Sequence, residues 1–129
     1  CQGFSSLRTR NGSRYNRDRR NELIYEMLRF ADVLKPKAIM LENVPGLAAY
    51  QPFKRLCAQL RARGYHVEFS VKDAADFGVP QRRRRLILLA GYGQALPFAR
   101  PTKRKKTVRD AIGRLPPPER SRDKLHRLG

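Results

Sequence analysis

Three short stretches of the chain combine reactive or charged side chains, and each is expected at a strand end or in the loop beside one. They are Cys1-Gln2-Gly3-Phe4-Ser5, Glu42-Asn43-Val44 and Gln81-Arg82-Arg83-Arg84-Arg85. A thiolate can attack an electrophilic carbon, a carboxyl group can donate a proton, and a guanidinium stays positively charged at any working pH. These are the residue types that nucleophilic chemistry with acid and electrostatic assistance would use.

Two helices are expected between these stretches. The first covers about residues 20–34, with Asp18 as its N-cap and Pro36 beyond its end. Its apolar side chains recur at three- and four-residue steps, namely Leu23, Met27, Phe30 and Leu34, with Ile24, Leu28 and Ala31 beside them. The second helix lies between Pro52 and Gly64, and one of its faces is made of Phe53, Leu56, Cys57 and Leu60.

Three strands are predicted around these helices. Residues 38–41 form a continuous apolar run that ends at Glu42, which is typical of a parallel strand buried on both faces. Residues 65–71 alternate between apolar and polar side chains, and residues 86–90 read as another buried strand. Because helices and strands alternate, the predicted fold class is α/β. Open α/β sheets place their sites outside the carboxyl ends of strands, so Cys1 and Glu42 could converge.

Composition restricts the class of partner. The 129 residues include 29 Lys and Arg but only 11 Asp and Glu, a net charge of +18 that favours a polyanion such as nucleic acid. An arginine-rich chain from a high-GC genome is the alternative. The 40% share of apolar residues excludes full disorder. No stretch approaches the ~20 apolar residues of a membrane span, and no signal peptide is visible.

The cysteines and histidines predict neither a disulfide framework nor a metal site. Cys1 and Cys57 are too few for a framework and favour a reducing compartment. His66 and His126 have no metal-ligand spacing, so no metal is expected.

Taken together, the three stretches resemble motifs of the DNA cytosine-5 methyltransferase family. The first resembles the family's Pro-Cys-Gln-x-Phe-Ser nucleophile motif without its Pro, and Leu41-Glu42-Asn43-Val44 resembles its Glu-Asn-Val motif. Phe77-Gly78-Val79-Pro80-Gln81, followed by Arg83 and Arg85, resembles its Gln-x-Arg-x-Arg motif. The resemblance extends to about Pro116 through Val108-Arg109-Asp110-Ala111-Ile112. Three motifs in this order, with matching connectors, form a highly specific pattern.

The resemblance implies a catalytic role for four residues. Cys1 would add to C6 of cytosine and make C5 nucleophilic. Glu42 would bind N3 and the amino group, and burial at the strand end would help it stay protonated. Arg85 would bond O2, with Arg83 on the same strand face because side chains alternate. Each has an alternative: an exposed thiol for Cys1, a turn carboxylate for Glu42, and a solvated or phosphate-binding patch for the arginines.

Other residues receive supporting roles from the same resemblance. Substrate-binding roles fall to Gln2, Ser5, Asn43 and Gln81. Contacts to DNA phosphates fall to Arg8, Arg10, Arg14, Arg82 and Arg84. Leu23 stands where the family has a cofactor-contacting residue. Asn43 has an alternative as a turn residue that bonds its own backbone. Residues 5–19 would form the loop that closes over a flipped nucleotide.

The resemblance also implies the partners and the organisation of the protein. The methyl donor would be S-adenosylmethionine and the substrate double-stranded DNA, in the bacterial cytoplasm and within a restriction–modification system. The fold would be Rossmann-like, with its first strands and Gly-rich cofactor loop missing before residue 1. Residues 1–97 would form a partial catalytic domain, and residues 98–129 a basic linker toward an absent target-recognition region. We therefore expect the isolated 129-residue chain neither to bind the cofactor tightly nor to methylate DNA.

Two other functions are compatible with these residues. One is a non-catalytic, basic nucleic-acid-binding module, and the other is a tRNA cytosine-5 methyltransferase. Gly3 and Ser5 are closer to the DNA branch of the family. The sequence indicates neither the target DNA sequence nor the oligomeric state.

Overall fold

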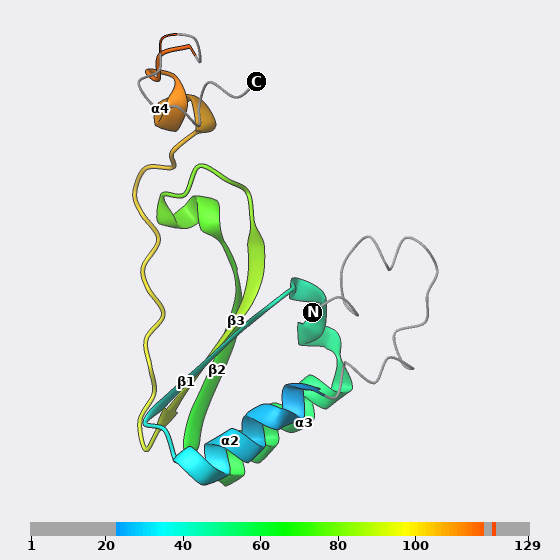
Figure 1. The fold of residues 1–129 in the computed structure, drawn as a ribbon. Helices are drawn as coiled ribbons and strands as arrows, with labels where there is room; N and C mark the ends of the chain where they lie inside the picture. The colour runs from blue at the N-terminus through cyan, green and yellow to red at the C-terminus, as the bar shows by residue number, and fades with distance from the viewer. Residues whose placement is uncertain (1–22, 118–119, 121–129) are drawn as a thin grey trace, which may run out of the picture. The chain divides into compact units, whose positions relative to one another are not determined.

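The computed structural model describes residues 23–117 and residue 120 (Figure 1). Their longer elements, in chain order, are α2 (Glu26–Leu34), β1 (Ala38–Asn43), α3 (Gln51–Ala62), β2 (Tyr65–Asp73), β3 (Arg84–Tyr92) and α4 (Val108–Ile112). Two short 3-10 helices, η4 (Pro45–Ala49) and η5 (Ala74–Phe77), follow β1 and β2. The chain divides into two compact units. We call residues 23–73 and 84–100 the sheet unit, and residues 74–83 and 101–117 the loop unit.

The sheet unit contains a three-stranded sheet in the order β1-β3-β2. Both β1 and β2 pair antiparallel with β3. The α/β class is confirmed, but the prediction that residues 38–41 form a parallel strand buried on both faces is wrong. Side chains along β1 alternate between exposed and half-buried, and Met40 is 68% exposed. A continuous apolar run does not by itself show which partner a strand takes, because burial and pairing are decided by neighbours distant in sequence.

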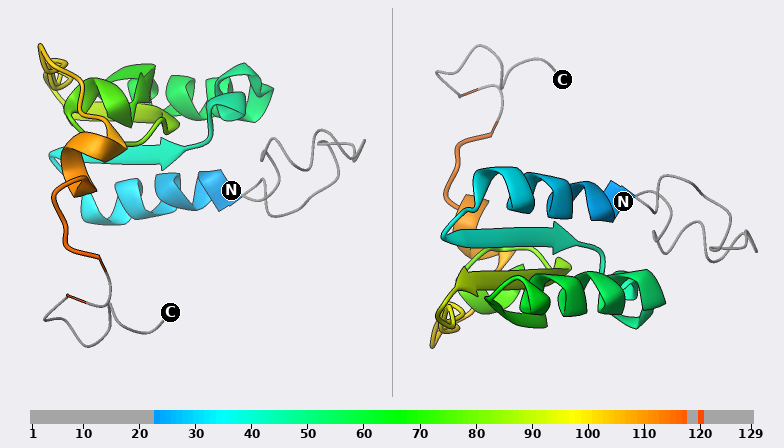
Figure 2. Two further views of the ribbon diagram at one scale, coloured as in Figure 1. Left: turned by 90° about the horizontal axis from the view of Figure 1, so that it is seen from above. Right: turned by 90° about the horizontal axis from the view of Figure 1, so that it is seen from below.

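The two faces of this sheet differ in chemistry. One face carries Leu86, Leu88 and Ala90, which have no exposed surface, and it packs into the core that α2 and α3 complete. We call the opposite side the open face. In both views of Figure 2, α2 lies along β1. Burial of apolar side chains on one side leaves the open face available for polar groups.

Helix α2 is buried on a different side from the one its strongest periodicity suggested. Leu28 and Ala31 are its buried residues, and Ile24 in the turn before it is buried beside them, whereas Phe30 in the helix and Leu23 before it are more than half exposed. The expected start of this helix, including its N-cap Asp18, lies outside the described residues. Its end agrees with the prediction, because the helix stops at Leu34. Lys35 then adopts the left-handed conformation with φ 43°, its N–H donates to the oxygen of Ala31 at 3.0 Å, and Pro36 follows.

Helix α3 and strand β2 confirm their predictions. The buried residues of α3 are Phe53, Leu56, Cys57 and Leu60, as the spacing indicated. Gly64 follows with φ 86°, a conformation that glycine adopts without strain. Burial raises the pKa of the Cys57 thiol. This cysteine is therefore a packing residue of the core.

The loop unit contains η5 and the capped helix α4. The Thr107 hydroxyl accepts a hydrogen bond from the Asp110 N–H at 3.1 Å, and the Asp110 carboxylate accepts one from the Thr107 N–H at 2.8 Å. These bonds hold the pKa of Asp110 below its ordinary value. Helix α4 thus coincides with the segment Val108–Ile112, which the family resemblance included. The proposed domain boundary at residues 97 and 98 stays a prediction.

Candidate functional site

Glu42 and Arg85 are in direct contact on the open face of the sheet. The Nε atom of Arg85 lies 2.7 Å from Oε1 of Glu42. The Arg85 Nη1 group also donates to the backbone oxygen of Arg84 at 2.8 Å. Side chains of Arg85 and Glu42 are 28% and 46% exposed, so an incoming ligand can reach both. Two of the sequence motifs therefore meet at one place.

Strand register explains why these two side chains meet. Glu42 in β1 stands opposite Ile87 in β3. Arg85 is two residues before Ile87, and side chains two apart in a strand share a face. Glu42 and Arg85 are thus diagonal cross-strand neighbours, a separation that two long side chains can bridge.

The burial expected for the Glu42 carboxyl group is not found. Its side chain is nearly half exposed, because it lies on the face opposite the one that packs into the core. The carboxylate is instead held by a guanidinium. The electrostatic surroundings of this carboxylate are therefore set by the charge of Arg85 and by any ligand that binds beside it, and not by burial.

Asn43 faces the opposite way from Glu42. It is 9% exposed, and its Oδ1 atom accepts a hydrogen bond from the N–H of Val44 at 2.9 Å. Such a local bond is the one expected of a turn residue. It shapes the exit from β1 into η4, where Leu47 is fully buried. In this arrangement Asn43 supports the backbone beside Glu42.

The premise that residues 81–85 form one continuous strand is wrong. Strand β3 begins at Arg84, so Gln81 and Arg83 lie before it. The N–H of Gln81 donates to the oxygen of Val79 at 2.8 Å, and the oxygen of Arg83 accepts from Ala74 at 3.0 Å. Gln81 and Arg83 belong to the loop unit, whereas Arg84 and Arg85 belong to the sheet unit.

Lys72 is a residue of the open face that the sequence reasoning missed. It stands directly opposite Arg85 in the β2–β3 register. Its ammonium group lies 4.6 Å from the centre of the Phe98 ring, a cation–π contact. The alternation of residues 65–71, extended by one residue, would have placed Lys72 on the face of Glu68 and Ser70. The predicted strand ended at residue 71, so this position was left out of it.

The remaining predicted site residues fall into three groups. Those outside the described residues are Cys1, Gln2, Ser5, Arg8, Arg10 and Arg14. Leu23 is described and is 63% exposed. Arg82 and Arg84 are both exposed; Arg82 belongs to the loop unit and Arg84 to the sheet unit.

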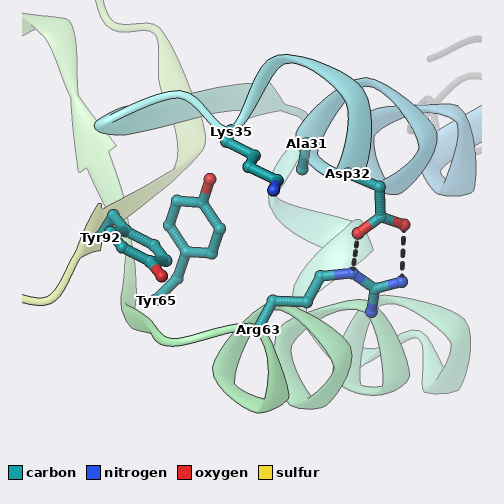
Figure 3. Close-up of a pocket in the computed structure, with 6 residues that line it drawn as sticks. All are labelled: Ala31, Asp32, Lys35, Arg63, Tyr65 and Tyr92. Atoms are coloured by element: carbon teal, nitrogen blue, oxygen red, sulfur yellow. Dashed lines mark hydrogen bonds and ion pairs between the residues drawn. The ribbon is translucent and has the colours of Figure 1, made fainter.

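A separate pocket of about 210 Å³ lies in the sheet unit (Figure 3). It is lined by Ala31, Asp32, Lys35, Arg63, Tyr65 and Tyr92. Two contacts join Asp32 to Arg63, at 2.6 Å from Nε and 2.9 Å from Nη2, and they lower the pKa of Asp32. Burial raises the pKa of Tyr65, whose hydroxyl donates to the oxygen of Pro36 at 2.8 Å. Because its strand residues lie at the far ends of β2 and β3 from Lys72 and Arg85, this pocket is separate from the Glu42–Arg85 contact.

The described residues contain neither a cluster of metal-ligating side chains nor a membrane-spanning helix. Among residues 23–117 and 120, no group of three or more His, Cys, Asp or Glu side chains could hold a metal ion. No helix in the same part of the chain is long and apolar enough to cross a membrane.

Comparison with known proteins decides the family. The family model for the C-5 cytosine-specific DNA methylases matches residues 1–125. The chain belongs to this family. Its matched region contains the Glu42 and Arg85 motifs and also the opening cysteine.

Individual members of the family resemble this methylase chain over only part of their length. The type II methyltransferase M.XorII of Xanthomonas oryzae is 44% identical over 126 residues, which are 92% of this chain and 28% of that protein. M.MthTI of Methanothermobacter thermautotrophicus is 35% identical over 131 residues, 96% of this chain and 38% of its own. The chain thus spans about a third of these relatives.

A solved structure supports the fold. The methyltransferase EhMeth of Entamoeba histolytica superposes with a TM-score of 0.59 over 82% of this chain and 34% of its own, at 20% identity. At this identity the likeness concerns the fold alone. It supports the Rossmann-like methyltransferase class, of which this cytosine methylase chain covers a fragment.

Proposed function

We propose that the chain is the catalytic part of a DNA cytosine-5 methyltransferase of the restriction–modification type. It would act on a cytosine flipped out of double-stranded DNA, through a covalent bond between the Cys1 sulfur and C6 of the base. The observation that carries the proposal is the 2.7 Å contact between Glu42 and Arg85, which come from different motifs.

The contact suits one edge of a cytosine ring. O2, N3 and the amino group follow one another along that edge, so residues that bind adjacent atoms must themselves be neighbours. Arg85 would donate to O2, and Glu42 would bind N3 and the amino group. An entering base thus replaces part of the ion pair with bonds to both partners. A fixed cation and a carboxyl group aimed at the same edge are pre-organised for the charge that develops there.

The proton and electron balance of the protein's part is simple. The Cys1 thiolate forms a bond to C6, and the electron pair of the C5–C6 double bond moves into the ring. The Glu42 carboxylate, which solvent can reach, takes up a proton from water and passes that proton to N3 as the ring gains this charge. After C5 has been substituted, a water molecule removes the C5 proton, the electron pair of the C5–H bond re-forms the C5–C6 double bond, the thiolate leaves C6, and N3 returns its proton to Glu42.

S-adenosylmethionine would supply an electrophilic methyl group on a sulfonium. The described residues do not by themselves form a cradle for it. Leu23 is exposed, and the pocket beside Tyr65 and Tyr92 lies at the far end of the sheet.

The decisive experiment uses Cys1→Ser in the protein expressed from its natural coding sequence. Methyl incorporation into duplex DNA should be lost while DNA binding is retained, because a hydroxyl is a far weaker nucleophile than a thiolate. Cys57→Ser is the matched control, since that thiol is buried in the core. Full methylation by Cys1→Ser would contradict the covalent mechanism. Methylation of tRNA in preference to duplex DNA would move the substrate to the RNA branch, and DNA binding without any methylation would favour the non-catalytic module.

A further inference from the structure

The loop unit has a strongly uneven charge. Its two ranges, 74–83 and 101–117, together carry two carboxylates, Asp76 and Asp110. It carries eight cationic side chains, namely Arg82, Arg83, Lys103, Arg104, Lys105, Lys106, Arg109 and Arg114. Asp110 is used inside the unit to cap α4. The contacts of the second carboxylate, Asp76, therefore decide which of these cations is neutralised inside the unit.

Asp76 holds the basic segment Thr102–Lys106 against η5. The N–H of Thr102 donates to the backbone oxygen of Asp76 at 2.8 Å, and its hydroxyl lies 3.2 Å from the same oxygen. The ammonium of Lys105 lies 2.7 Å from Oδ1 of Asp76. The Thr102 hydroxyl is also 3.1 Å from the oxygen of Arg104, which closes a tight turn. Backbone and side chain of one residue thus fasten the segment at two points.

The contact with Asp76 neutralises one of the four adjacent cations of this segment, Lys105, and leaves the other three available for a ligand. Lys103, Arg104 and Lys106 are exposed, and within the described ranges none of them forms an ion pair. A run of four adjacent cations would repel itself and sample many conformations if it were untethered. Held at Asp76, it presents fixed positive charges at a lower entropic cost of binding.

We propose that Lys103, Arg104 and Lys106 form a second phosphate-binding segment for duplex DNA, fixed in place by the Asp76 clamp. The proposal rests on the proposed function for its choice of duplex DNA. The regular row of phosphates on a duplex matches closely spaced cations, and such contacts position a protein without reading sequence. Arg82 of the same unit, which the family resemblance assigned to a phosphate contact, adds a further positive charge.

The first test removes the three charges. The variant K103Q/R104Q/K106Q is compared with K37Q/K54Q/R55Q, which removes the same residue types from exposed positions of the sheet unit. Binding to a labelled duplex of arbitrary sequence is followed by fluorescence anisotropy at several salt concentrations. Each lost phosphate contact should reduce the slope of log K against log salt by about 0.9, so the first variant should lose about two to three and the control less than about one. Equal slopes for the two variants would overturn the proposal.

The second test examines the clamp. Asp76→Asn raises the net charge by one but frees Lys105, and Asp32→Asn raises it equally outside the loop unit. Charge alone predicts tighter DNA binding by both variants. The proposal predicts that only D32N binds as tightly as wild type or tighter, and that D76N binds two- to fivefold more weakly. Tighter binding by D76N would contradict the clamp.

The same preparations separate this proposal from the proposed function. If Cys1→Ser keeps methylating while K103Q/R104Q/K106Q shows the reduced salt slope, the covalent mechanism fails and the phosphate-binding segment stands. If wild type methylates duplex DNA and the triple variant keeps the wild-type slope, the segment fails and the function stands. Preference of the wild type for a tRNA competitor over duplex DNA would overturn the choice of partner.

Discussion

Lys72 on β2 and Arg85 on β3 stand directly opposite each other, yet each cation has its own partner. Arg85 contacts Glu42 at 2.7 Å, and Lys72 lies over the ring of Phe98 at 4.6 Å. Like charges directly opposite in a sheet are destabilising unless they are compensated. The Glu42 carboxylate therefore both orients Arg85 and offsets a repulsion at this end of the sheet.

Glu42→Gln should lower methyl transfer by about 10²–10⁴-fold, because an amide cannot supply the proton to N3. DNA binding should change little. Glu68→Gln is the control, since Glu68 is exposed on the same face of β2. Single-turnover methylation assays measure the effect, and thermal melting shows whether the lost charge compensation destabilises the fold. Equal activity of the two variants would contradict the role of Glu42.

Arg85→Gln and Arg84→Gln should differ in kind. Arg85 points to Glu42 on the open face, so its loss should reduce the rate of methylation at saturating DNA. Arg84 is exposed, and as a phosphate contact its loss should reduce the salt slope of DNA binding by about one while sparing that rate. If R84Q lowered the saturated rate as much as R85Q, the division of roles between these neighbours would be wrong.

Leu88→Ala should destabilise the protein by about 2–5 kcal/mol, because this fully buried side chain of the central strand would leave a cavity. Leu89→Ala, on the open face of the same strand, should cost clearly less. Urea denaturation followed by circular dichroism measures both. A larger loss for Leu89 would show that the two faces of β3 have been assigned in reverse.

The pair of Asp32 and Arg63 should make stability depend on pH in the acid range. The pKa of Asp32 lies below its ordinary value of 3.8 in the folded protein, because Arg63 bonds the carboxylate. The stabilising contribution is therefore present above pH 3.8 and is lost as the pH falls through the lower folded pKa. Asp32→Asn should melt below wild type at neutral pH, and the difference should shrink under acid conditions. A melting difference that grew on acidification would contradict the assignment.

The isolated chain of 129 residues should show no micromolar affinity for S-adenosylmethionine. Its sequence has no Gly-rich strand-to-helix turn, and the described residues form no cradle for the cofactor. Isothermal titration calorimetry of the chain measures this. Addition of about 1,000-fold the dissociation constant of a bound ligand would stabilise a protein by about 4 kcal/mol, so the absence of a shift in melting temperature is a second readout.

The sequence by itself determined the family, the α/β class and most element positions. Three ordered motifs identified the family, and spacing predicted the buried face of α3 because a helix with one apolar stripe has only one way to face a core. Tertiary structure alone decided the pairing of β1, the buried side of α2 and the contact between Glu42 and Arg85. These depend on the order β1-β3-β2 and on its register, which bring together residues that are far apart in the chain. A local sequence pattern does not show which distant residues will become neighbours in the fold. For the same reason the sequence did not reveal the contact of Lys72 with Phe98 or that of Asp76 with Lys105. In each case the partner lies far away in the chain and only folding brings it close.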